Sequence, residues 1–117
     1  MKRILVVDDE PDIAVVLAEL LEAEGYQTAR AANGREGLDQ ILKSPPDLVL
    51  MDLMMPVMDG SQLLAHLKGD PKLRNLPVIV MSAGNPPPVV TASGVTFLPK
   101  PFDVDVLLGH IFKLIGK

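Results

Sequence analysis

The chain has 117 residues, of which 48% are apolar, and this predicts a single globular domain over residues 1–117. It has no cysteine, which excludes disulfides and thiolate metal sites and suits a reducing compartment, so we expect a cytoplasmic protein. No run approaches the roughly 20 apolar residues of a membrane span, and the apolar run 4–7 is too short for a signal peptide. The formal charge is −4 and no basic stripe is present, so direct binding to nucleic acid is not expected.

The first half of the chain alternates short apolar runs with segments of helical periodicity. Residues 4–7 predict a buried strand, and Asp9 and Pro11 mark the start of a helix that ends at Gly25. The apolar positions of this helix on one face are Ile13, Leu17, Leu20 and Leu21. Residues 26–31 are more polar and predict a strand near a sheet edge. After an Asn33-Gly34 turn, a helix over residues 35–43 is expected to turn Leu38, Ile41 and Leu42 inward.

The second half repeats the pattern. Residues 48–51 are apolar without alternation and run into Asp52, which is typical of a central strand covered on both faces. Asp59-Gly60 predicts the cap of a third helix, and residues 78–81 predict a strand that ends at Ser82. Residues 95–98 predict a last strand before Lys100, and Asp103 precedes a final helix.

Five strands that alternate with helices predict an α/β fold, a doubly wound five-stranded parallel sheet with helices on both faces. The weakest segment lies between Ser82 and Lys100, where three consecutive prolines occupy positions 86–88. Prolines remove backbone donors and favour polyproline geometry. We therefore expect the fourth helix to be truncated or missing and the segment to be a mobile loop. Amide-exchange protection throughout residues 86–93 would contradict this mobility.

Residues able to do chemistry follow four of the five predicted strands. They are Asp8 and Asp9, Asp52, Ser82 and Lys100. Because parallel strands end at one edge of a sheet, these side chains should meet there. Clustered carboxylates repel one another and need a cation, and donors that are all oxygen favour Mg²⁺. A cation beside a lysine and a hydroxyl suits a phosphoryl group, which a carboxylate can accept.

Together these motifs resemble the receiver domain of two-component response regulators. The resemblance rests on Val7-Asp8-Asp9-Glu10, on Asp52 followed by Met55-Pro56 and Asp59-Gly60, on Ser82-Ala83 and on Lys100-Pro101-Phe102. It covers about residues 2–116, and its joint spacing is specific although each motif alone would be weak. It implies a flavodoxin-like sheet with strand order 2-1-3-4-5.

The resemblance also implies a role for each of these residues. Asp52 would accept a phosphoryl group from a sensor histidine kinase or a histidine phosphotransfer protein, and Lys100 would contact the phosphoryl oxygens. Mg²⁺ would be held by Asp8, Asp9, Asp52 and the backbone carbonyl of Met54. Ser82 and Phe97 would act as the conformational switch, and the Lys100-Pro101 peptide bond would be cis.

The leading interpretation is a phosphoacceptor switch rather than an enzyme that acts on other substrates. A receiver-like adaptor that works by protein contact without phosphorylation is the first alternative, because the proline-rich segment interrupts the region of the fourth helix. A hydrolase of the haloacid dehalogenase type is less favoured, since Met54 stands where that chemistry needs a second acid. Phe97 as ordinary core filling also stays open, and the sequence leaves the cognate kinase, any downstream target protein and a homodimer undetermined.

Overall fold

A computed structural model of the chain describes residues 1–116, which form five strands alternating with five helices. The strands are β1 (Arg3–Val7), β2 (Gln27–Ala31), β3 (Leu48–Asp52), β4 (Val78–Ser82) and β5 (Thr96–Pro99). The helices are α1 (Pro11–Ala23), α2 (Gly34–Lys43), α3 (Gly60–Gly69), α4 (Pro88–Ser93) and α5 (Val104–Ile115). None of the helices in this described part is long and apolar enough to cross a lipid bilayer.

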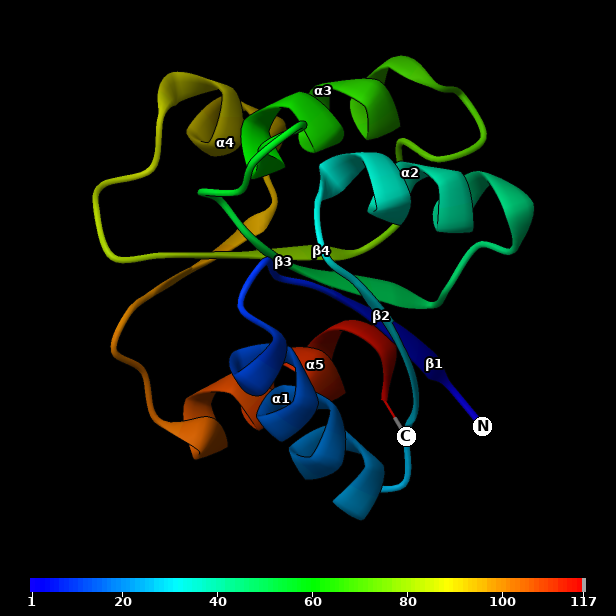
Figure 1. The fold of residues 1–117 in the computed structure, drawn as a ribbon, viewed down its shortest axis with the longest axis vertical. Helices are drawn as coiled ribbons and strands as arrows, with labels where there is room; N and C mark the ends of the chain where they lie inside the picture. Colours follow the sequence, from blue (N-terminus) through cyan, green and yellow to red (C-terminus); the bar gives the residue numbers. More distant parts are fainter. Residues whose placement is uncertain (117) are drawn as a thin grey trace.

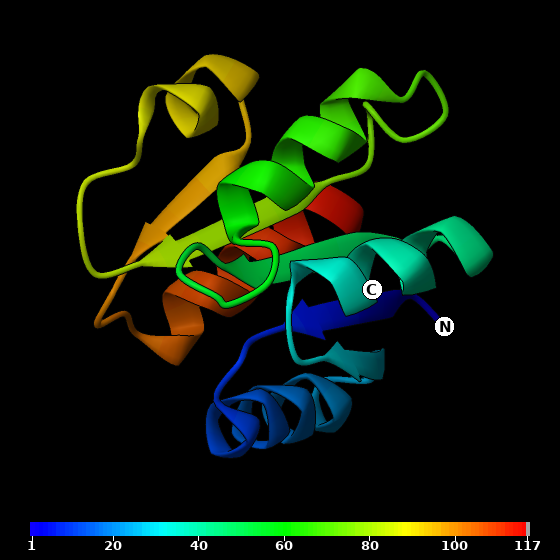
Figure 2. The ribbon, with the colours of Figure 1, turned by 45° about the horizontal axis from the view of Figure 1, so that its top comes forward.

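The strands form one parallel sheet in the order β2-β1-β3-β4-β5, which confirms the predicted order and the edge position of β2. Helices α1 and α5 cover one face, and α2, α3 and α4 cover the other (Figure 1). The register sets Asp52 beside Met81 and Ser82 beside Pro99, so the carboxyl ends of β3, β4 and β5 are level. The turned view shows these strand ends on one side of the molecule (Figure 2).

Strand β3 is the centre of the core, and all five of its residues are buried. Because side chains alternate along a strand, its residues feed two separate clusters on the two faces. Val49 and Met51 pack in the cluster that includes Leu63 of α3. Leu48 and Leu50 pack in the cluster that includes residues of α1 and α5. The predicted central strand is therefore confirmed.

Two apolar residues predicted to face inward are exposed instead. Ile13 is 41% exposed and Leu42 is 58% exposed. Each stands one position from a residue of the buried stripe of its helix, Ala14 in α1 and Ile41 in α2. One residue rotates the side chain by about 100° around an α-helix, enough to carry it off the covered face. The predictions for Ile13 and Leu42 were therefore wrong.

Helix α4 is truncated, as predicted, but it is not missing. It has six residues, with Pro88 in the first turn, where the absent N–H costs no helical hydrogen bond. Val90 is buried and anchors the helix to the cluster that includes Leu63 and Leu67 of α3. Gly94 ends the helix in the left-handed conformation, with φ of 74°. The mobility of this segment stays a prediction.

Candidate functional site

The buried polar residues of the described chain gather at one edge of the sheet. Among residues 1–116, the buried polar or charged side chains are Asp8, Asp52 and Ser82. They stand at the carboxyl ends of β1, β3 and β4, which are neighbouring or near-neighbouring strands in the sheet. Burying polar groups is costly unless they are paired or used. The described part of the chain therefore carries the free-energy cost of burying polar side chains at this edge of the sheet.

Asp9 joins Asp8 and Asp52 to form an acidic cluster. One carboxylate oxygen from each of the three residues lies within 4.8 Å of the others. At this separation two unit negative charges repel by about 3 kcal/mol at an effective dielectric constant of about 20. Asp8 and Asp52 are buried and Asp9 is exposed, so one side of the cluster is open to solvent. The sequence correctly predicted that these three acids meet.

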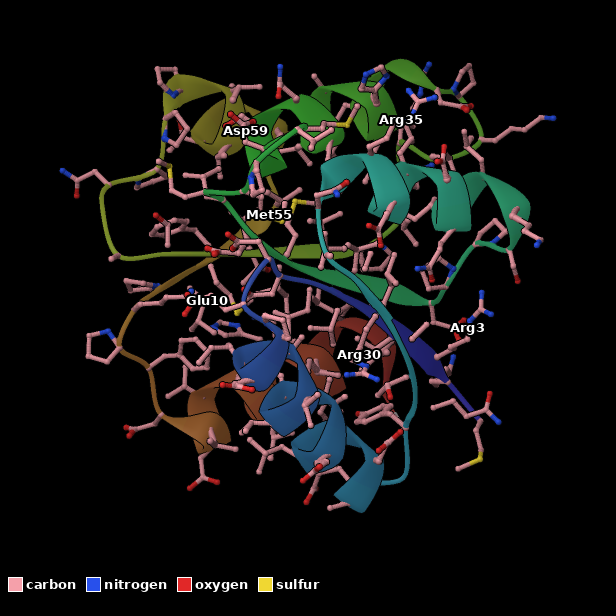
Figure 3. All side chains as sticks on the ribbon, in the orientation of Figure 1. Arg3, Glu10, Arg30, Arg35, Met55 and Asp59 are labelled. Atoms are coloured by element: carbon pink, nitrogen blue, oxygen red, sulfur yellow. The ribbon has the colours of Figure 1, made fainter. Side chains whose placement is uncertain are left out.

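Asp8 is held by backbone hydrogen bonds, but only one of its two carboxylate oxygens has a hydrogen-bond partner. Its Oδ1 accepts a hydrogen bond from the backbone N–H of Glu10 at 2.9 Å, and its own N–H donates to the Ala31 carbonyl at 3.0 Å. Its Oδ2 is buried and has no hydrogen-bond partner. Glu10 lies on the β1–α1 loop at this edge (Figure 3). A buried carboxylate oxygen without a partner, next to two further carboxylates, fits a hard divalent cation such as Mg²⁺.

Burial raises the pKa of Asp8 above its ordinary value of 3.8; the Glu10 amide opposes this shift, and Asp52 adds to it. A raised native pKa means that the folded state holds its proton to higher pH than the unfolded state does. Stability from this group is thus greatest below the unfolded pKa and falls as pH rises through the folded pKa. We expect Asp8→Asn to stabilise the metal-free protein by about 1 kcal/mol at neutral pH, by removing a buried, half-satisfied charge. Urea unfolding between about pH 4 and pH 8 should show the gain appear as pH rises; a gain that is equal at every pH would contradict this origin.

Lys100 supplies positive charge next to Asp52. Its Nζ lies 3.4 Å from Asp52 Oδ1, and its side chain is 27% exposed. Its backbone N–H donates to the Ser82 carbonyl at 2.8 Å, which fixes the start of the β5–α5 loop against β4. The Lys100-Pro101 peptide bond is cis, as the resemblance implied. Lys100 therefore reaches the acidic cluster from the strand end predicted for it.

Ser82 and Phe97 lie near this edge in different surroundings. The Ser82 hydroxyl is buried and accepts a hydrogen bond from the Gly84 N–H at 3.3 Å. Phe97 is half-buried and packs against the cluster that contains Val80 and Val90. An ordinary core residue would pack in the same way as Phe97. The switch roles of Phe97 and of Ser82 therefore stay predictions.

The β3–α3 loop leaves Asp52 and is closed tightly by Gly60. The Gly60 N–H donates to the Leu53 carbonyl at 2.8 Å. A Cβ atom at Gly60 would lie 2.7 Å from the Asp52 carbonyl oxygen and 2.8 Å from Leu53 Cα, distances at which backbone must move. Asp59 caps α3 in a reciprocal capping box with Gln62. Met55 and Asp59 mark the loop in Figure 3, and Met54 within it is 73% exposed.

Val57 in this loop has a left-handed backbone, with φ of 67°. This conformation is disfavoured for a β-branched residue, whereas asparagine tolerates it. The Val57 side chain is 79% exposed, so little packing is lost on its replacement. We expect Val57→Asn to raise the free energy of unfolding by about 1 kcal/mol, seen as a higher urea midpoint with an unchanged slope. A lower urea midpoint for this variant would show that valine at position 57 stabilises the protein relative to asparagine.

Sequence reasoning missed two supports of the site. The N–H of Glu10 that donates to Asp8 is a backbone group, so the residue type at position 10 does not predict this hydrogen bond. The close approach of Gly60 to the backbone of Asp52 could have been suspected from a glycine directly after a cap, but Asp59-Gly60 was interpreted only as a helix cap and as part of the receiver-domain motif. Both supports act on the carboxylates through the main chain.

Comparison with known proteins agrees with this geometry. Residues 4–112 match the family model of the response regulator receiver domain. The sporulation initiation phosphotransferase F of Bacillus subtilis is 38% identical over 97% of this chain and 94% of its own length. The receiver domain of a signal transduction histidine kinase from Syntrophus aciditrophicus has a TM-score of 0.90 and 39% identity, over 98% of this chain and 90% of that one. A sensor histidine kinase receiver domain from Pseudomonas aeruginosa, crystallised with a magnesium ion coordinated in its active-site cleft, has a TM-score of 0.88 and 26% identity, over 99% of this chain and 98% of that one. The chain therefore belongs to the response regulator receiver domain family of two-component signal transduction.

Proposed function

We propose that this chain is a Mg²⁺-dependent phosphoacceptor switch, in which Asp52 takes a phosphoryl group from a phosphohistidine on a kinase or phosphotransfer protein. The observation that supports this most is the meeting of three carboxylates within 4.8 Å with Lys100 at 3.4 Å from Asp52. A structural role alone would not require two of these acids to be buried together. A cytoplasmic location belongs to the same proposal and is supported by the absence of cysteine.

Asp8, Asp9 and Asp52 would hold the metal ion, together with the backbone carbonyl of Met54. The unpartnered Oδ2 of Asp8 supports this assignment, because it is a buried acceptor that the protein leaves free. The all-oxygen donor set suits Mg²⁺, and such ions keep several waters when they bind a few carboxylates. Bound there, the ion would supply positive charge that offsets the carboxylates and the oxygens of a phosphoryl group.

Asp52 would act as the nucleophile. One of its carboxylate oxygens forms a bond to phosphorus while the bond between phosphorus and the donor histidine nitrogen breaks. The imidazole leaves with the electron pair of that bond and takes a proton from solvent, and Asp52 becomes an acyl phosphate. Lys100 would neutralise charge on the transferred group, and the distance of 3.4 Å from its Nζ to Asp52 Oδ1 supports this role.

Phosphorylation would then shift a conformational equilibrium. The new phosphoryl oxygens would accept a hydrogen bond from the Ser82 hydroxyl, whose oxygen accepts from the N–H of the exposed Gly84 through a long bond of 3.3 Å. A move of Ser82 would carry the β4–α4 loop with it, and Phe97 packs against the core cluster that includes Val90 of α4. Phosphorylation can drive such a shift only if the phosphoryl group interacts more favourably with one conformation than with the other. A downstream target protein and a homodimer stay predictions.

An apolar groove next to the site would receive the phosphodonor. It has a volume of about 540 Å³ and lies between α1 and the β5–α5 loop, and both Glu10 and Lys100 are among its lining residues. Ile13, Val16 and Phe102 supply its apolar lining, and Ile13 and Val16 are 41% and 54% exposed. Glu10 lines the groove and is exposed, and four further exposed acids are sequence neighbours of lining residues: Asp12, Glu19, Asp103 and Asp105. An amphipathic helix with an apolar stripe and basic flanks is complementary to this groove, and its position beside Lys100 would bring a phosphohistidine to Asp52.

We expect Val16→Glu to slow phosphoryl transfer from a phosphorylated histidine phosphotransfer protein by about tenfold or more, the effect of losing a contact residue of an interface. Transfer from acetyl phosphate, which needs no docking surface, should be unchanged. Leu42→Glu is the matched control, because Leu42 is a similarly exposed apolar residue, 58% against 54% for Val16, on a helix outside this groove. Equal losses with both donors, or equal losses in both variants, would remove the groove from the proposal.

Exposure of the chain to a ³²P-labelled phosphohistidine donor with Mg²⁺ tests the proposed function itself. The switch predicts transfer of label to this chain in a form that hydroxylamine removes, as expected for an acyl phosphate. The adaptor, whose case rests on the short six-residue α4, predicts no label with any donor. Rapid release of inorganic phosphate without labelled protein would instead indicate a hydrolase.

A further inference from the structure

The β3–α3 loop is joined to helix α2 by a backbone hydrogen bond. The N–H of Gly34, the first residue of α2, donates to the Met58 carbonyl at 2.9 Å. Gly34 is buried, and the start of the helix is fixed by Asn33, whose side chain accepts from the Glu36 N–H at 2.9 Å. The loop thus rests on an element that contributes no residue to the acidic cluster.

No side chain fits at Gly34. A Cβ atom there would lie 2.3 Å from the Met58 carbonyl oxygen and 2.9 Å from Met58 Cγ, closer than real Cβ contacts. The backbone oxygen cannot rotate away as a flexible side chain can. A substitution must therefore displace either the helix or the loop.

Helix α2 is the less movable of the two. Even a Cβ at Gly37 would already come within 3.1 Å of Val7 Cγ2, so the helix packs directly on β1. Ile41 further along is fully buried. In the loop, by contrast, Met54 and Val57 are 73% and 79% exposed. A displacement caused at Gly34 would be taken up by the loop.

The other end of the loop is fixed by the core. The Leu53 carbonyl accepts from the Gly60 N–H, and the Leu53 N–H donates to the Met81 carbonyl at 2.9 Å. Residues 54–58 consequently span two fixed points, Leu53 and Met58. The position of the Met54 backbone therefore depends on both Leu53 and Met58.

We propose that Gly34 is a positioning residue for the metal site, acting through Met58 on the carbonyl of Met54. This inference rests on the proposed function, in which that carbonyl is a metal ligand. Gly34 touches neither metal nor phosphoryl group; it allows α2 to approach the loop closely enough to fix the loop conformation. Supporting groups behind metal ligands commonly change metal affinity by about 10-fold to 100-fold when altered.

Mg²⁺ affinity of the full chain, measured by isothermal titration calorimetry, tests the proposal without any phosphodonor. We expect Gly34→Ala to bind Mg²⁺ at least about tenfold more weakly than the unsubstituted chain. The control is Ile41→Val, which also destabilises α2 packing but lies away from the loop and should bind Mg²⁺ as the unsubstituted chain does. Urea midpoints of both variants establish that loss of stability is not the cause.

Two further variants keep the result interpretable. Val57→Asn is expected to stabilise the loop, so Gly34→Ala is also made in that background in case it fails to fold alone. In Gly34→Ala with Met58→Ala, the side-chain clash is relieved but the carbonyl clash remains, so the weak Mg²⁺ binding should persist. Full recovery in that double variant, unchanged affinity in Gly34→Ala, or an equal loss in Ile41→Val would overturn the inference. If the unsubstituted chain itself bound no Mg²⁺, the proposed function would fail instead.

Discussion

Replacement of Asp52 by Asn is expected to abolish phosphoryl incorporation from both acetyl phosphate and a phosphohistidine protein. The carboxamide oxygen is a poor nucleophile, and among residues 1–116 Asp52 is the acid that pairs with Lys100, at 3.4 Å. The change preserves shape at a buried position, so the fold should be kept. Intact-protein mass spectrometry after incubation with Mg²⁺ and donor measures the loss directly.

Asp59→Asn is the control for this experiment. Asp59 also belongs to the β3–α3 region, but its side chain caps α3, and asparagine caps a helix about as well as aspartate. The control should be phosphorylated like the unsubstituted chain. Incorporation that survives in Asp52→Asn would assign the acceptor to another residue and refute the role proposed for Asp52.

Removal of the Lys100 charge is expected to have the second largest effect. In Lys100→Gln the rate of incorporation from acetyl phosphate should fall by about 10²–10³-fold, the usual cost of removing one preorganised group that stabilises developing charge. Lys100→Arg keeps the charge with a different shape and should lose less. Initial rates at saturating Mg²⁺, followed by intact mass, give the comparison.

Lys68→Gln controls for loss of a lysine as such. Lys68 is also partly buried, but its Nζ donates to the Arg74 carbonyl beyond the far end of α3. Its rate should match that of the unsubstituted chain. If Lys100→Gln were phosphorylated at an unchanged rate, Lys100 would be only an ion-pair partner of Asp52.

Much of the fold could be predicted because the sequence pattern and the buried faces agree. Strand β3 consists of four apolar residues followed by an acid; all five are buried, and the four apolar ones divide between the two core clusters. Parallel connections then bring the ends of β1, β3 and β4 to one edge, so the meeting of Asp8 and Asp52 and the place of Ser82 at the same edge followed from strand ends alone. The three consecutive prolines likewise predicted the short α4.

Other features depend on geometry that residue types do not encode. Ile13 and Leu42 fit an apolar stripe of helical period, yet each lies one position off the covered face. The exposed Ile13 is one of the apolar residues that line the groove beside Lys100. The contact between Gly34 and Met58 depends on the path of the backbone in three dimensions, which the residue types do not encode. The left-handed conformation of Val57 was also not predictable, because a β-branched residue normally avoids it.

The most direct test of a metal-assisted phosphoacceptor is the mass of the intact chain after exposure to acetyl phosphate, with Mg²⁺ and with EDTA, followed by peptide mapping. We predict the gain of one phosphoryl group in Mg²⁺, carried by Asp52, and no gain in EDTA. Incorporation that is equal in EDTA, or that maps to a residue other than Asp52, would contradict the account built on the cluster of Asp8, Asp9 and Asp52.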